Sequence, residues 1–115
     1  MEQFALAEVL RMRAQGSAPY YEFLRVPAMS VGAYELGVGD EDRQQPHTED
    51  ELYYVVSGKA TLLVGEDNVP VEAGSMVYVP ALVVHRFHTI TSALTVLVFF
   101  APAEYTNRET QAPQS

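Results

Sequence analysis

From Tyr20 to Ala101 the sequence alternates short runs of strand-forming residues with turn signals. The runs are rich in Val, Tyr, Phe and Leu, and turn-forming residues separate them, as at 37–39 and 66–68. Short strands at such regular spacing are typical of an all-β sandwich or barrel, and about eight of them can close a small barrel. The predicted strands are 20–26, 30–37, 51–57, 60–65, 69–72, 76–79, 83–89 and 93–100.

The two ends of the chain differ from this pattern. Apolar residues from Phe4 to Met12 recur with rough helical spacing, and Gly16 stops the pattern, which predicts a short helix over 4–15. After Pro102 the chain becomes polar, a composition that usually frays and that we expect to carry no chemistry. The predicted organisation is therefore an N-terminal helical segment (1–18), one β-barrel (19–102) and a polar C-terminal tail (103–115).

Charge and composition limit the partners that we expect. A chain of 115 residues has room for one core, and its net charge of −8 repels phosphate backbones and anionic lipid surfaces. Nucleic acid and membrane are therefore not expected as partners. The first residues lack the features of a signal peptide, and no apolar run is long enough to span a bilayer, so we expect a cytoplasmic protein.

The residues available for chemistry are few. The chain has no cysteine, which excludes disulfides and thiolate sites and leaves imidazole and oxygen ligands for a metal. Its three histidines are His47, His85 and His88. Any imidazole chemistry must use these three side chains.

The spacing of His47 and Glu51 constrains the local chain. On one straight strand, four residues span roughly 13 Å, too far for two ligands of one ion with bonds of about 2 Å. The intervening residues 48–50 must therefore turn or bulge, so that both side chains can converge inside the barrel. Gln45 lies two residues before His47 and shares its face, where its amide oxygen offers a further ligand.

His85 can reach the same point from the opposite wall of the barrel. The segment from Gly74 to His85 is interpreted as a turn, a short strand, a second turn and the start of a further strand. On that strand Phe87 and Thr89 would follow His85 inward, whereas Arg86 and His88 would point to the other face, so His88 is interpreted as a non-ligand.

The sequence resembles the cupins, and in particular the small single-domain members of that family. The first cupin motif, G-x5-H-x-H-x3,4-E-x6-G, matches Gly39, Gln45, His47, Glu51 and Gly58 with every spacing kept, and Gln45 replaces the first histidine. The second motif, G-x5-P-x-G-x2-H-x3-N, matches Gly74, Pro80, Leu82, His85 and Thr89, where Leu82 replaces a glycine and Thr89 the asparagine. Several fixed spacings in two motifs are far more specific than any single pair.

The resemblance implies a jelly-roll β-barrel that binds one divalent metal ion through His47, Glu51 and His85, with Gln45 in the place of the usual histidine. It also implies a homodimer. Gln45 is either a fourth ligand or a neighbour that orients a ligating imidazole by a hydrogen bond.

Each candidate also has a purely structural interpretation. His47 could be a surface histidine in an acidic loop, Glu51 an exposed carboxylate at a strand start, and His85 a core histidine. A buried Glu51 needs a partner, and a metal would supply it. The acidic run 40–42 is interpreted as a solvated loop.

Two imidazoles and one carboxylate leave positions open on an octahedral ion, which favours iron(II) binding substrate and dioxygen together. The first hypothesis is therefore a dioxygenase-like enzyme that acts on a small organic molecule. With zinc, manganese or nickel, the site could instead serve an isomerase, cyclase or lyase. The alternative hypothesis is a non-catalytic module that binds or senses a small ligand. The predicted pocket candidates are Tyr34, Tyr53, Phe87 and Phe99, and the alternative for these aromatic residues is plain core packing.

Overall fold

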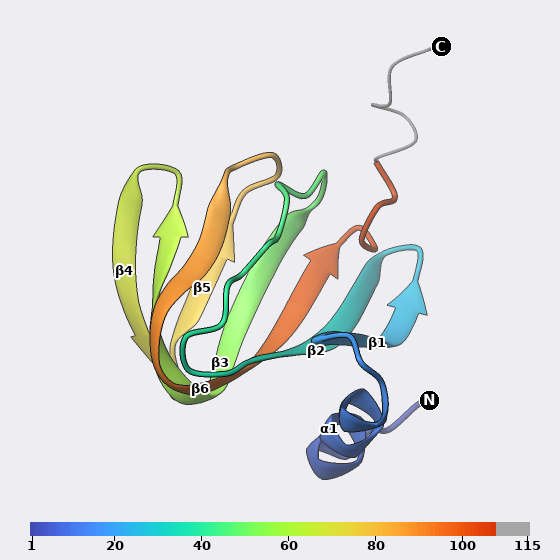
Figure 1. Ribbon diagram of the computed structural model, residues 1–115. Helices are drawn as coiled ribbons and strands as arrows, with labels where there is room; N and C mark the ends of the chain where they lie inside the picture. Colours follow the sequence, from blue (N-terminus) through green and yellow to red (C-terminus); the bar gives the residue numbers. More distant parts are fainter. Residues whose placement is uncertain (108–115) are drawn as a thin grey trace.

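The computed structural model describes residues 1–107, and within them one short helix is followed by a curled antiparallel sheet (Figure 1). This order confirms the predicted all-β architecture with an N-terminal helix. The elements are α1 (Leu6–Gln15), β1 (Tyr20–Val26), β2 (Met29–Leu36), β3 (Asp50–Val64), β4 (Asp67–Glu72), β5 (Met76–Val79) and β6 (His85–Ala101).

Two long strands replace two pairs of predicted strands. β3 joins the predicted strands 51–57 and 60–65, and β6 joins 83–89 and 93–100. Bulges bend these strands without ending them, because the pairing of β3 with β6 shifts register between Val55 and Thr61. The turn signals in the sequence therefore mark bends inside strands at these two places.

The bends let β3 and β6 take part in both walls of the barrel. Residues 50–57 of β3 pair with 95–101 of β6, and residues 59–64 pair with 85–92. The sheet order is β1-β2-β6-β3-β4, and β5 pairs with the first part of β3. The curled sheet encloses the core, and the largest apolar side chains that are fully buried in it are Tyr53, Val55, Leu62, Val79, Phe87, Leu94, Val96 and Phe100.

Helix α1 packs beside β1 and β2, at the end of the sheet away from β4 (Figure 1). It buries Val9, and Arg13 forms an ion pair with Glu35 of β2 at 2.6 Å. The helix begins two residues later than predicted, and Phe4 packs against Phe23 with ring centroids 5.0 Å apart. With ten residues, α1 is too short to cross a bilayer, and residues 1–107 hold no other helix that could.

The start of the predicted C-terminal tail is ordered against the barrel. Ala103 and Glu104 are buried, and the backbone N–H of Glu104 donates to Ser30 Oγ at 2.8 Å. Glu49, which is 1% exposed, accepts the backbone N–H groups of Tyr105 and Asn107 at 2.6 and 2.8 Å. The expectation of a frayed tail is therefore wrong for 103–107, because a buried carboxylate more than fifty residues earlier holds the backbone of this segment. The rest of the predicted tail, 108–115, lies outside the described residues.

Candidate metal centre

Three buried side chains from separate parts of the chain meet inside the barrel. His47 lies in the loop before β3, Glu51 is the second residue of β3, and His85 is the first residue of β6. Oε1 of Glu51 lies 3.3 Å from Nδ1 of His47 and 3.0 Å from Nε2 of His85. One candidate ligand atom from each residue lies within 4.8 Å of the other two. The structure thus brings together three of the four side chains predicted as ligands.

The local chain follows the turn that the spacing required. The backbone bends at Thr48 and Glu49, and β3 begins at Asp50. The carbonyl oxygen of His47 accepts the backbone N–H of Leu82 at 2.7 Å, which ties this loop to the turn before β6. The two histidines are therefore held by segments that are bonded to each other.

The donor atoms fit a divalent metal ion. Oε2 of Glu51 is buried without a hydrogen-bond partner within residues 1–107, while Nδ1 of His47 and Nε2 of His85 both face the other oxygen of that carboxylate. An octahedral ion with bonds of about 2.1 Å places neighbouring ligand atoms about 3.0 Å apart, close to the two distances observed. Two nitrogens and one carboxylate oxygen suit iron, zinc, manganese or nickel.

The charges of the cluster favour its ionised state when no metal is bound. Burial alone would lower the pKa of His47, but hydrogen bonds with Glu104 and Glu51 outweigh burial and raise the pKa to about 9. Burial likewise opposes protonation of His85, whose pKa is raised by Glu51. The pKa of Glu51 would be raised by burial, but the two histidines lower it. Because a metal binds neutral imidazole, it has to displace these protons.

The second ring nitrogen of His85 is fixed by the backbone. Its Nδ1 lies 2.8 Å from the carbonyl oxygen of Val83, which can only accept a hydrogen bond. Nδ1 therefore carries the proton of the neutral ring, and Nε2 keeps its lone pair directed towards Glu51.

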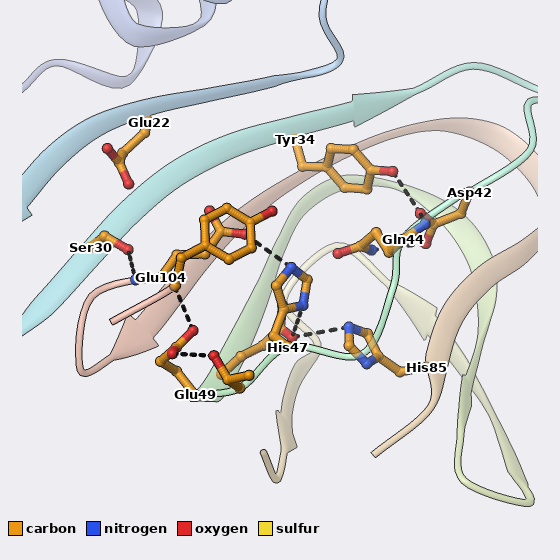
Figure 2. Close-up of polar contacts among 12 residues, drawn as sticks. Glu22, Ser30, Tyr34, Asp42, Gln44, His47, Glu49, His85 and Glu104 are labelled. Carbon is orange, nitrogen blue, oxygen red and sulfur yellow. Dashed lines mark hydrogen bonds and ion pairs between the residues drawn. The ribbon is translucent and has the colours of Figure 1, made fainter. Parts of the chain in front are cut away.

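Glu104 is a member of the site that the sequence did not predict. One of its carboxylate oxygens, Oε2, lies 2.9 Å from Nε2 of His47, and its side chain is 11% exposed (Figure 2). Glu104 lies outside both motifs, in the segment interpreted as a polar tail. No residue pattern pointed to it, because its place depends on how the backbone folds back after β6.

The structure places Gln45 at the rim of the site. Gln45 is exposed and lines the cavity next to His47, so its role as a ligand stays a prediction. The adjacent Gln44 points inward and accepts the hydroxyl of Tyr53 at 3.2 Å. Gln44 also donates to Asp42 at 2.9 Å (Figure 2).

The interpretation of 40–42 as a solvated loop agrees with the exposed Asp40 and Glu41 but is wrong for Asp42. It is 6% exposed and accepts the Tyr34 hydroxyl at 2.6 Å and the backbone N–H of Phe87 at 2.8 Å. Asp42 therefore clamps the loop that carries His47 to β2 and β6.

A cavity of about 630 Å³ borders the cluster at His47. Its apolar and aromatic wall consists of Tyr20, Tyr34, Val98, Phe100 and Tyr105, and its polar wall includes Arg43, Gln44, Gln45, His47 and Glu104.

Of the predicted pocket candidates, Tyr34 lines this cavity, while Tyr53 and Phe87 are core residues that pack on each other. Phe99 is half-buried and is not among the described residues that line the cavity. Phe100 lines the cavity instead, and the centroid of its ring lies 4.7 Å from that of the His47 ring. In the first part of β6 the odd-numbered residues His85 and Phe87 are buried. In the last part the even-numbered apolar residues are buried, from Leu94 to Phe100. The prediction that Thr89 faces inward is wrong, because Thr89 is exposed and has a φ of 52°. This residue and the shifted pairing of β6 with β3 lie between the two stretches and together account for the change of parity.

His88 points away from the cluster, as its parity predicted. Its Nε2 lies 2.7 Å from the side-chain oxygen of Asn68, and its Nδ1 lies 3.0 Å from the Thr89 hydroxyl. His88 is therefore a natural control for experiments on the other two histidines.

Comparisons with known proteins place the fold. The chain is 49% identical over 104 residues to an uncharacterized protein of Streptomyces coelicolor, covering 90% of this chain and 99% of that protein. The crystal structure of TT1209 from Thermus thermophilus superposes with a TM-score of 0.70 at 24% identity, covering 90% of this chain and 99% of that one. Salicylate 1,2-dioxygenase from Pseudoaminobacter salicylatoxidans, solved as adducts with gentisate, gives a TM-score of 0.68 at 17% identity, over 84% of this chain and 30% of that one. At these identities the two solved structures show the fold alone.

The family model of the cupin domain matches residues 32–101, more than half of the chain. This match contains both predicted motifs and the three clustered side chains, His47, Glu51 and His85. The chain therefore belongs to the cupin domain family.

Proposed function

We propose that this cupin is a metal-dependent enzyme, dioxygenase-like in its chemistry, that acts on a small organic molecule. The observation that carries the proposal is the position of three buried donor side chains, with an unpartnered carboxylate oxygen among residues 1–107, beside a cavity of about 630 Å³. The proposed cofactor is one divalent ion per chain, with iron(II) favoured and zinc, manganese or nickel as alternatives. Three protein ligands would leave positions on such an ion for a substrate and for dioxygen.

The cavity supports a small, partly aromatic substrate. Its volume lies within the usual range for small-molecule sites, and aromatic walls with a few polar groups are typical of them. Arg43 supplies a positive charge at the wall, and the ion pair that it forms within the described part of the chain is an exposed one with Glu41 at 3.3 Å. Exposed pairs contribute little free energy, so Arg43 can turn to an organic acid, phenolate or enolate.

The fold similarity to salicylate 1,2-dioxygenase supports the direction of this proposal, because 84% of this chain superposes on part of a protein named as a dioxygenase. Fold does not determine reaction, so the proposal depends on the side chains of the site. The same site with another metal would favour an isomerase or cyclase, and a site without turnover would be a binding or sensing module.

Oxygen consumption tests the proposal. The protein loaded with iron(II) is exposed to catechols, flavonols, thiols and β-diketones, and we expect substrate-dependent oxygen uptake with at least one class. His85→Ala should abolish the uptake and His88→Ala should retain it. Tight ligand binding without uptake across the panel, unchanged in His85→Ala, would instead favour the binding module.

We also propose that two copies of the chain associate through the outer face of β3 and β5. Exposed apolar side chains lie side by side there, with Leu52 (39% exposed) paired in register with Tyr78 (57%) and Met76 (68%) following on the same face of β5. Covering such a face with a second apolar face removes it from water. Light scattering at micromolar concentration should give twice the chain mass, and Tyr78→Glu should give a monomer. A wild-type monomer would contradict the proposal.

A further inference from the structure

The two histidines of the cluster present different ring nitrogens to its centre. His85 directs Nε2 towards Glu51 at 3.0 Å and keeps Nδ1 on the carbonyl of Val83. His47 directs Nδ1 towards the same carboxylate oxygen at 3.3 Å, so its Nε2 points away from the centre. That outward nitrogen meets Glu104 at 2.9 Å.

Glu104 is held in place independently of His47. Its backbone N–H donates to Ser30 Oγ at 2.8 Å, and its carbonyl oxygen accepts Nη2 of Arg25 at 2.7 Å. The following residues are bonded to Glu49. Figure 2 shows the bond of the Glu104 backbone to Ser30 and the ion pair of the Glu104 carboxylate with His47. A carboxylate carried by backbone that is fixed in this way can orient an imidazole instead of following it.

We propose that Glu104 is a positioning residue that accepts the Nε2–H of His47 and thereby commits Nδ1 of His47 to the metal, while His85 binds the same metal through Nε2. A neutral imidazole has one N–H and one lone pair, and an ionised carboxylate can only accept a hydrogen bond. A proton held at Nε2 therefore leaves the lone pair on Nδ1, which faces Glu51. This inference rests on the metal site of the proposed function and adds that the segment after β6 completes that site.

The tautomers can be read directly in zinc-loaded protein labelled with ¹⁵N in its histidines. Two-bond ¹H–¹⁵N correlation spectra distinguish the protonated from the metal-bound nitrogen of each ring. We expect His47 to be protonated at Nε2 and bound through Nδ1, and His85 to show the reverse. His85 thus serves as an internal reference, since its Nδ1 is fixed by a backbone carbonyl that no side-chain substitution removes.

Substitution of Glu104 gives a second readout. Removing a group that orients a ligating histidine typically costs about 10- to 100-fold in metal affinity, and we expect a loss of that size for Glu104→Ala. Glu104→Gln keeps an acceptor oxygen, so it should retain the tautomer and lose less affinity. Glu35→Ala is the matched control, because Glu35 is a partly buried carboxylate that pairs with Arg13 at 2.6 Å and accepts the Thr95 hydroxyl at 2.8 Å, away from the contacts that hold Glu104, and it should leave zinc affinity within about twofold of wild type.

The possible failures are distinguishable. Zinc bound through Nε2 of His47, or a Glu104→Ala affinity equal to that of Glu35→Ala, would overturn this inference and leave the metal site intact. A wild-type protein that binds no zinc would contradict the metal site itself, and the inference with it.

Discussion

The bend in β3 at Gly58 can be tested by adding a single methyl group. Gly58 has a φ of +100°, and a Cβ there would lie 2.2 Å from the backbone oxygen of Ala93 and 2.7 Å from Cα of Leu94. Gly74 has a similar φ of +93° but nothing within 4 Å of the same position. The two glycines therefore share the cost of a positive φ and differ in the cost of a steric clash.

The expected magnitudes follow from that difference. A side chain at positive φ costs roughly 1–2 kcal/mol, which is the full effect expected for Gly74→Ala. Gly58→Ala should add about 1–3 kcal/mol, since the clash is with backbone that can yield only if β6 moves away from β3. Urea unfolding of both variants, with free energies extrapolated to water, measures the difference. Equal destabilisation of the two variants would refute the reasoning, because it would mean that the close approach of β6 to Gly58 carries no cost.

Four further predictions concern the cluster and the loops that hold it. The affinity for zinc should rise with pH up to about pH 9, by about tenfold per pH unit for each proton displaced, because His47 with its raised pKa must release a proton. Competition titrations measure this affinity, and a constant value from pH 6.5 to 8 would contradict the prediction. In the metal-free protein the same raised pKa contributes stability that is fully present below about pH 6.5 and is lost as the pH rises through about 9, which urea unfolding across that range measures. Glu49→Ala should cost about 3 kcal/mol of unfolding free energy and weaken zinc binding, since the carboxylate accepts two backbone amides of the segment that carries Glu104; a loss below about 1 kcal/mol would show that the segment is held by other contacts. Tyr34→Phe should cost about 1.5–3 kcal/mol by removing its buried hydrogen bond to Asp42, and wild-type stability would contradict the clamp on the loop that carries His47.

The sequence predicts the parts of the site that depend on local spacing. The distance along the chain from His47 to Glu51 demands a turn, and the structure has that turn at Thr48 and Glu49. The fold class and the strand positions follow equally well from turn signals and strand-forming runs. Bends inside β3 and β6 are not predictable in this way, because Gly58 can end a strand or bend it and only the partner strand decides which.

The contacts that the sequence does not reveal are those between distant segments. Phe100, and not Phe99, faces the cavity because the parity of β6 changes near Thr89, a bulge that no residue pattern announces. Glu49 and Glu104 are acidic residues in polar stretches, where solvent exposure is the ordinary expectation. Their burial results from backbone amides and an imidazole brought to them by the tertiary fold.

The metal content of the purified protein tests the central claim most directly. The protein should be prepared without added metal and without an affinity tag, and then analysed by mass spectrometry for divalent metals. We expect about one ion per chain in the wild type and in His88→Ala, and its loss in His47→Ala and in His85→Ala. A wild-type content of only a small fraction of an ion per chain, with no difference on substituting His47, would contradict the account.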